Sequence, residues 1–316
     1  MVYYLILHSI IFVLLLIPSF ILFLAYITYP FSWGTKDYGW VVFSILFQVI
    51  IFLYASKKII PKIIYIYNCI GRTHIDAGEY QVALSCFNDS LYWNPKNIYA
   101  LFHRGMIYHH LKQYENAIED YKTLLSLEPT HQNALESLAS VYYWSDDKEK
   151  AVEIYNQLIE LYPDHSEYYA YRGNCYLHLK NWDQLLTDSE HFITLKPELA
   201  LGYYNRGCTY LILGRYEEAI IDFDVAVIKW IYQEDRSGWT NFPNPYTRRA
   251  YAKSCLKRYD EAKNDYEIAL SINANDAGYF YYRYLMYESM GDSILAMNDL
   301  IKAQTLDPNI AQHYYK

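Results

Sequence analysis

The sequence repeats itself at an interval of 34 residues, and this period limits the possible folds more than any other feature. Units begin at residues 64, 98, 132, 166 and 200. The period then slips by nine residues, over 234–242, and resumes with units at 243 and 277. Proline at position 32 of five of these seven units predicts the end of a helix there. No unit of this size can bury its own apolar face, so the pattern predicts stacked units.

Small and large residues alternate at fixed positions within the units. The eighth residue is small in Gly71, Gly105, Ala139, Gly173, Gly207 and Ala250. The twenty-fourth is large in Phe87, Tyr121, Tyr155, Phe223, Tyr266 and Leu300. This pattern predicts two helices per unit that approach closely at the small residue. The fourth unit departs from it, with Leu185, Ser189 and Phe192 where Ala, Phe and Ala are usual, and we expect looser packing there.

These repeats resemble the tetratricopeptide repeat family, most clearly in the strings RGMIYHHLKQYENAIEDYKTLLSLEPT (104–130) and RGCTYLILGRYEEAIIDFDVAV (206–227). The resemblance covers residues 64–310. It implies an all-α fold, a right-handed superhelix (an α-α solenoid) of about seven units within 64–316. It also implies that the first helix of each unit lines a concave groove that binds a protein or peptide. The few residues after 310 predict an end without the capping helix usual in such arrays.

The N-terminal part is strongly apolar, and we interpret residues 1–58 as a membrane anchor. No charged residue occurs between Val2 and Tyr29, and a second apolar run follows from Trp40 to Ala55. The first run is long enough for a bilayer core of roughly 30 Å. Aromatic residues crowd the connection between the runs, as expected at a membrane interface. The sequence predicts a hairpin of two transmembrane helices, at about 3–29 and 38–56; the alternative is one span followed by an interfacial helix.

Basic residues predict the orientation of this anchor. Lys57, Lys58 and Lys62 follow the second apolar run, whereas the connection carries Lys36 beside Asp37. The positive-inside rule therefore places the repeats in the cytoplasm, on an inner or plasma membrane. We expect Pro61 to end the membrane helix before the first repeat.

By the family resemblance, positions 2, 5, 9, 12 and 13 of the units face the groove. The candidate partner-binding residues at these positions are Arg72, Phe102, Met106, His109, His110, Glu136, Tyr143, Trp144, Asn174, His178, Tyr204, Tyr251 and Tyr281. Aromatic area with a few orienting polar groups suits an extended peptide or a helix. The insertion at 234–242 is interpreted either as a functional loop or as an ordinary connection.

Charge and motif content exclude several other functions. The net charge of −8 and the lack of basic clusters disfavour nucleic acid as a partner. No nucleophile motif, phosphate loop or dinucleotide fingerprint occurs, so we expect no enzyme, no cofactor and no small-molecule substrate. His109 and His110 are helix neighbours whose side chains diverge, so no metal site is expected. The sequence predicts a membrane-anchored scaffold for a protein or peptide partner. The alternative is a non-catalytic subunit of a membrane translocation, secretion or envelope-assembly complex.

Overall fold

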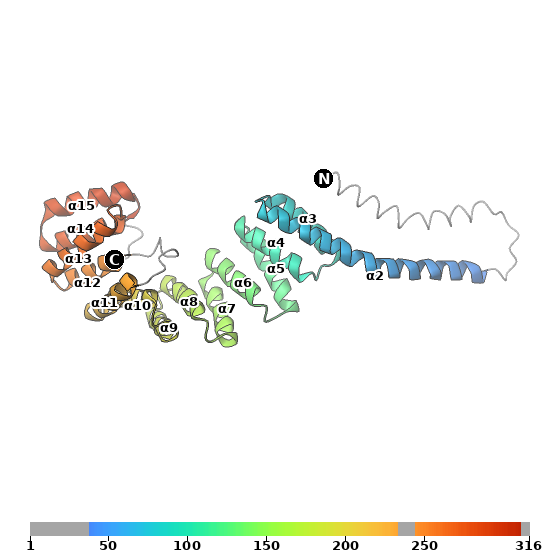
Figure 1. Ribbon diagram of the computed structural model, residues 1–316, viewed down its shortest axis with the longest axis horizontal. Helices are drawn as coiled ribbons and strands as arrows, with labels where there is room; N and C mark the ends of the chain where they lie inside the picture. Colours follow the sequence, from blue (N-terminus) through green and yellow to red (C-terminus); the bar gives the residue numbers. More distant parts are fainter. Residues whose placement is uncertain (1–37, 233–243, 311–316) are drawn as a thin grey trace. The chain divides into compact units, whose positions relative to one another are not determined.

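The computed structural model describes the backbone of residues 38–232 and 244–310, and side chains within 57–231 and 244–310. In this part of the chain the regular structure is α-helical, with fourteen helices labelled α2 to α15 (Figure 1), which confirms the predicted all-α repeat fold. The chain forms two compact units, Met1–Leu127 (unit 1) and Glu128–Lys316 (unit 2). The predicted apolar segment at about 3–29 and the insertion at 234–242 lie outside the described residues.

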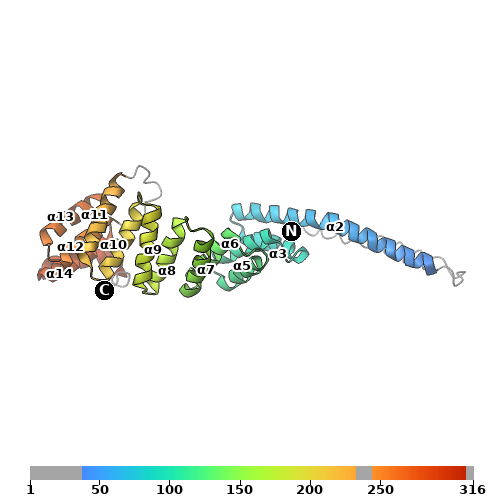
Figure 2. The ribbon, with the colours of Figure 1, turned by 90° about the horizontal axis from the view of Figure 1, so that it is seen from below.

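The helices form antiparallel pairs that follow one another in chain order within each unit (Figures 1 and 2). Unit 1 contains α2 (Tyr38–Asp76) with α3 (Tyr80–Trp93), and α4 (Ile98–His110) with α5 (Tyr114–Leu127). Unit 2 contains the pairs α6 (Gln132–Trp144) and α7 (Lys148–Leu161), α8 (Ser166–His178) and α9 (Trp182–Leu195), α10 (Ala200–Ile212) and α11 (Tyr216–Tyr232), α12 (Pro245–Cys255) and α13 (Tyr259–Ile272), and α14 (Ala277–Met290) and α15 (Ser293–Leu306).

An aromatic ring lies directly on a glycine backbone inside several pairs. A Cβ atom added at Gly71, Gly105 or Gly207 would come within 2.8 Å of Phe87, Tyr121 or Phe223 respectively. These are positions 8 and 24 of the units, and the rings at position 24 are fully buried. Because heavy atoms cannot approach that closely, a side chain at any of these three glycines would require the ring or the helix to shift. The small-and-large pattern of the sequence therefore sets the distance between the helices of a pair.

A buried salt bridge joins the two helices of five pairs. In each, an Arg on the first helix donates hydrogen bonds through two nitrogens to both carboxylate oxygens of an Asp sixteen residues later. The pairs are Arg104–Asp120, Arg172–Asp188, Arg206–Asp222, Arg249–Asp265 and Arg283–Asp299. The fork geometry fixes the orientation of one helix against the other as well as their distance.

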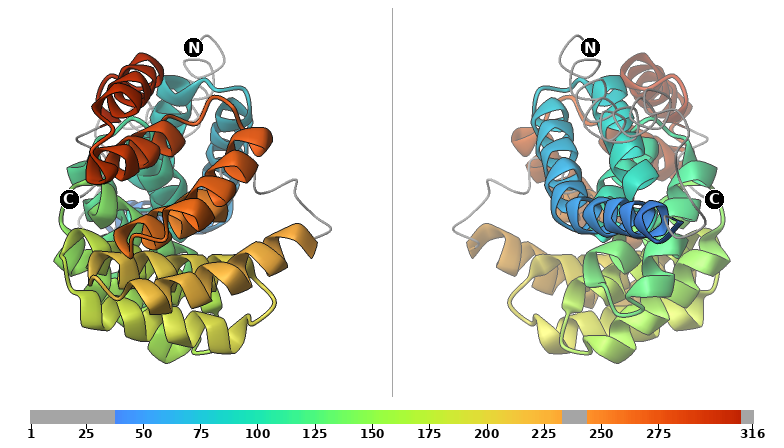
Figure 3. Two further views of the ribbon diagram at one scale, coloured as in Figure 1. Left: turned by 90° about the vertical axis from the view of Figure 1, so that its left-hand side faces the viewer. Right: turned by 90° about the vertical axis from the view of Figure 1, so that its right-hand side faces the viewer.

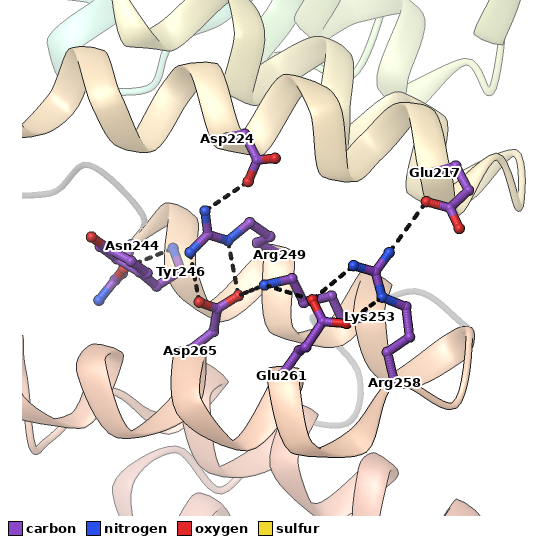
Figure 4. A network of polar contacts seen from close by, with 9 residues as sticks. All are labelled: Glu217, Asp224, Asn244, Tyr246, Arg249, Lys253, Arg258, Glu261 and Asp265. Carbon is purple, nitrogen blue, oxygen red and sulfur yellow. Dashed lines mark hydrogen bonds and ion pairs between the residues drawn. The ribbon is translucent and has the colours of Figure 1, made fainter.

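Three of these arginines also reach back to the preceding helix pair. Arg104 donates a hydrogen bond to Asn88 of α3 at 2.7 Å, and Arg172 donates one to Asn156 of α7 at 2.6 Å. Figure 4 shows the third, in which Arg249 joins Asp265 of its own pair and Asp224 of α11 at 2.7 Å. This last contact holds α12 against α11 after the insertion. The stacking of the repeats therefore continues across the nine extra residues.

One backbone conformation closes all seven pairs. The turn residue at position 15 of each unit has a φ angle between 55° and 80°. These residues are Gly78, Lys112, Asp146, Lys180, Gly214, Lys257 and Gly291. The left-handed conformation costs a non-glycine residue about 1–2 kcal/mol, and four of the seven accept that cost. Helix pairing, rather than the residue in the turn, therefore determines the turn geometry.

The expected helix end at Pro61 is wrong, because α2 continues through this proline from Tyr38 to Asp76. Proline removes one backbone hydrogen bond from a helix interior, at a cost of about 3 kcal/mol. The packing of α2 against α3, with Ile63 and Tyr67 buried, favours a continuous helix over that cost. Among the residues whose side chains the structure describes, no helix is long and apolar enough to cross a membrane.

The last helix, α15, lies at the end of unit 2, and no further described helix covers its outer side (Figure 3). Ile294, Met297 and Ile301 lie on one stripe of α15 and are 76%, 56% and 55% exposed. Ala296 and Ala303, on the opposite side, are buried against α14. The prediction of an end without a capping helix concerns residues after 310, which lie outside the described residues.

The buried bridges should contribute more to stability than the exposed ion pairs beside them. Replacing Asp222→Asn removes the negative charge opposite Arg206, and we expect the free energy of unfolding to fall by about 2–3 kcal/mol. The control is Glu218→Gln on the same helix, whose partner Arg215 is equally exposed and which should change stability little. Urea unfolding followed by helical circular dichroism measures both. Equal losses for the two variants would contradict the structural role of the bridge.

Candidate binding surface

The most exposed aromatic group among the candidate residues lies where α6 and α8 end. The Tyr143 hydroxyl and His178 Nε2 are 2.9 Å apart, which joins two successive first helices of unit 2. The Trp144 ring meets the Tyr143 ring edge-on, with 5.5 Å between centroids, and Trp144 is 62% exposed. We call Tyr143, Trp144, Lys148 and His178 the α6–α8 aromatic cluster. The sequence predicted three of its four members.

Lys148 was not predicted, and it holds this cluster in place. Its ammonium group lies 4.5 Å from the centroid of the Tyr143 ring and donates a hydrogen bond to the Tyr143 carbonyl. It also pairs with Asp146 at 3.0 Å, although Asp146 itself is almost fully exposed. A cation near the face of an aromatic ring is attracted by the ring quadrupole, and this attraction stabilises the position of Tyr143. The one sequence feature that could have indicated this role is the position of Lys148 at the start of α7, next to the turn that follows α6.

Glu136 takes part in a network between α6 and α8 instead of standing free. Its carboxylate accepts hydrogen bonds from the Tyr168 hydroxyl and from Gln132 at 3.1 Å. The Tyr168 ring is buried and stacks on the His165 ring, with 4.2 Å between their centroids. Burial and the carboxylate together raise the pKa of Tyr168 above its usual range, so its hydroxyl remains a donor. Glu136 therefore orients α6 against α8 below the aromatic cluster.

The later tyrosines of unit 2 lie mostly inside the protein. Tyr204 and Tyr281 expose only 5% of their surface, and Tyr251 is half-buried with its ring 4.7 Å from that of Tyr282. The reason is that α12 contacts both α10 and α14, so tyrosines on these first helices pack between them. Arg248, which we did not predict, donates hydrogen bonds to the hydroxyls of Tyr204, at 3.3 Å, and Tyr282. Tyr204 and Tyr281 are therefore buried in the protein interior and do not form part of an exposed binding surface.

A cavity of about 70 Å³ lies between α8, α9 and α10. It is in the fourth repeat, where the sequence departs from the pattern. Position 24 there is Ser189 in place of a ring, and a Cβ added at Gly173 would meet only Leu185, at 3.2 Å, and Asp188, at 3.8 Å. The expectation of looser packing in this repeat is therefore confirmed. Asn174, a predicted groove residue that is exposed, lines the cavity.

The predicted residues of unit 1 lie on α2 and α4, and they are only partly accessible. Arg72 is exposed and pairs with Asp76 at 3.2 Å, and Met106 is 38% exposed. His110 is exposed and packs on Tyr80 at 4.4 Å. His109 and Phe102 are half-buried, with ring contacts to Tyr114 at 6.0 Å and Tyr121 at 6.1 Å respectively. The adjacent histidines therefore face different neighbours.

His103 is buried among the rings of unit 1. It is 7% exposed, its centroid is 4.2 Å from that of Tyr99 and 5.8 Å from that of Phe87, and its Nδ1 has no hydrogen-bond partner among the described residues. Burial, assisted by the positive charge of Arg72, lowers the pKa of His103 to about 4. The imidazole is therefore neutral in the folded protein at neutral pH.

Acid should destabilise the protein through His103. An unfolded histidine has a pKa of about 6.5, so between pH 6.5 and 4 the unfolded chain binds a proton that the folded chain excludes. Stability then falls as the pH falls, by about 3 kcal/mol between pH 7 and 4.5 at most. Urea unfolding of wild type and His103→Leu at both pH values isolates this effect, because other groups titrate in both chains. An equal pH dependence of the two chains would count against a neutral buried His103.

Comparison with protein families agrees with the helix pairs described above. Three family profiles described as "Tetratricopeptide repeat" match residues 70–140, residues 108–175, and residues 200–227 with 243–276. Together these matches span more than half of the chain. A search of curated protein sequences gives no match.

Solved structures with a similar fold include other repeat proteins. A tetratricopeptide repeat protein from Parabacteroides merdae superposes with a TM-score of 0.62 at 19% identity, covering 79% of this chain and 97% of its own. MamA gives 0.51 at 24% identity, covering 57% of this chain and 97% of its own. A chain of the APC/C hetero-tetramer Cut9–Hcn1 gives 0.53 at 17% identity, covering 78% of this chain and 51% of its own. At these identities the similarity shows the fold.

Proposed function

Because the chain belongs to the tetratricopeptide repeat family, we propose that it is a non-enzymatic scaffold that binds a peptide or protein partner along the first helices of its repeats. The observation that carries the proposal for unit 2 is the α6–α8 aromatic cluster. Trp144 is 62% exposed, although indole is among the most favourable groups to bury at an interface. Its neighbours Tyr143 and His178 are held by each other, so little conformational entropy is lost when a partner binds.

The charge of the chain agrees with a protein partner. The net charge of −8 opposes binding to nucleic acid. The groups whose pKa values are raised or lowered include buried tyrosines and cysteines, the histidines His103 and His109, and members of the Arg–Asp bridges. Each of these shifts has a structural cause in burial or pairing. A surface that offers aromatic area and hydrogen-bonding groups fits recognition of a polypeptide.

Removing the aromatic cluster should weaken partner binding and leave the fold intact. We expect the Tyr143→Ala/Trp144→Ala variant to bind a captured partner at least about tenfold more weakly, because two aromatic rings of an interface, here the exposed Trp144 and the half-buried Tyr143, each contribute about 1 kcal/mol or more. The matched control is Ile221→Ala/Ile228→Ala, which removes exposed apolar groups from the second helix α11. Titration calorimetry measures the affinity, and circular dichroism the helix content. Equal affinity losses in the two variants, or loss of helix in the first, would contradict the proposal.

We further propose that residues 1–58 anchor the scaffold to a membrane with the repeats in the cytoplasm. Support comes from the two apolar runs and from the three lysines that follow them. Lys57, Lys58 and Lys62 are all exposed on α2. An anchored scaffold would hold its partner close to the bilayer, which shortens the search for membrane-bound targets.

Deleting residues 1–56 should release the repeats from the membrane fraction and leave partner capture unchanged. The shortened chain keeps the part of α2 that packs on α3, including Ile63 and Tyr67. Fractionation of cells by ultracentrifugation shows the location, and a pull-down with the same bait shows the binding. If the shortened chain stays with membranes, the anchor is wrong. If it leaves the membrane but loses its partner, the alternative of a membrane-complex subunit is favoured.

A further inference from the structure

The cavity between α8, α9 and α10 exists because one repeat lacks its usual packing residue. In five of the other repeats an aromatic side chain at position 24 accompanies a small residue at position 8. At Gly207, for example, the Phe223 ring leaves no room for a Cβ atom. Ser189 stands at this position in the fourth repeat, and its hydroxyl donates a hydrogen bond to the Leu185 carbonyl of its own helix. The space that a ring would fill is left to the cavity.

The lining of this cavity is mostly hydrocarbon and carries no free charge. Leu177, Leu185, Phe192 and Ile212 contribute apolar surface. The one carboxylate, Asp188, is held by two hydrogen bonds from Arg172, at 3.0 Å and 2.5 Å. An ion entering here would lose its hydration without a counterion, whereas an aliphatic group would gain about 25 cal/mol for each Å² buried.

The size of the cavity limits what fits. A cavity of about 150 Å³ holds benzene, with its six carbon atoms, so 70 Å³ accommodates about three or four non-hydrogen atoms. That is the size of the side chain of valine, leucine or isoleucine. An aromatic ring is too large unless the cavity is widened.

Two side-chain amides lie in the same lining. Asn174 of α8 is exposed and Asn205 of α10 is half-buried. Neither side chain makes a hydrogen bond within the part of the chain that the structure describes. Each amide offers donors and an acceptor, which together complement the C=O and N–H of a peptide group. An apolar cavity with amides of this kind fits a residue of an extended chain better than a free hydrocarbon.

We propose that the fourth repeat is a specificity pocket that takes one branched aliphatic side chain of the partner peptide, with Asn174 and Asn205 binding the peptide backbone beside it. The proposal rests on the proposed function, since it needs a peptide bound along the first helices. It adds that Leu, Ile or Val at one position of the partner is required.

The test uses a library of random dodecapeptides displayed on phage and selected on the full chain in lipid nanodiscs, where no free detergent competes for the cavity. The binding of synthetic versions of the selected peptides is then measured by fluorescence anisotropy. We expect them to share one aliphatic residue whose replacement by Ala weakens binding about ten- to hundredfold, the value of one buried aliphatic side chain.

Two variants then address the pocket directly. Leu185→Ala/Ser189→Phe restores the residues usual at positions 20 and 24 and fills the cavity. It should weaken the binding of the selected peptides by the same factor. On this variant the Ala replacement in the peptide should cause no further loss. Leu185→Ala alone widens the cavity and should shift selection toward Met or Phe. Leu185 is buried, so the fold of the Leu185→Ala variant is checked by circular dichroism. If Leu185→Ala unfolds, the Leu185→Ala/Ser189→Phe variant still tests the proposal.

The outcomes separate this inference from the proposed function. If the filled variant binds the peptides as well as wild type while Tyr143→Ala/Trp144→Ala loses them, the scaffold stands and the pocket is overturned. If no peptide binds wild type, both fail. Selection of peptides without any common aliphatic residue would also overturn the pocket.

Discussion

The contact of a position-24 ring with a position-8 glycine is the interaction on which the rest of the structure depends. At Gly71, Gly105 and Gly207 the ring touches the backbone of the opposite helix, which leaves no space for any side chain. This contact determines how close the two helices lie. In the pairs that contain Gly105 and Gly207, Arg and Asp sixteen residues apart also form forked bridges at hydrogen-bond distance. Packing sets the distance, and the salt bridges select one orientation among those that packing allows.

The same contact explains why a cavity lies where the ring is missing. Ser189 replaces the ring in the fourth repeat, so that pair keeps its bridge, Arg172–Asp188, but has a cavity beside it. The helices stay in place because the bridge and the turn at Lys180 follow the common pattern. A repeat can therefore lose its central side chain without losing its geometry. Such a site is where a binding pocket can arise within a regular array.

Much of this fold follows from the sequence because the repeat makes the same local pattern visible seven times. Period, helix ends and the looser fourth repeat could all be inferred from Gly, Ala, Pro and aromatic positions. The Arg–Asp spacing was visible too, but charged residues on helices are usually solvated, and only the pair geometry shows these to be buried. The burial of Tyr204 and Tyr281 could not be inferred, because it depends on how closely α10, α12 and α14 approach. The predicted helix end at Pro61 was wrong, because the tertiary packing of α2 overrides the local preference of proline.

The continuity of α2 has a mechanical consequence. At 1.5 Å per residue, a helix of 39 residues is about 58 Å long, and its C-terminal half is the first helix of unit 1. No linker separates residues 38–56 from the repeat that begins at residue 64. A rotation of the N-terminal half of α2 is therefore transmitted directly to the first repeat of unit 1. A tilt of about ten degrees at one end displaces the other by roughly 10 Å. The tilt of the N-terminal half of α2 therefore determines the orientation of the first repeats.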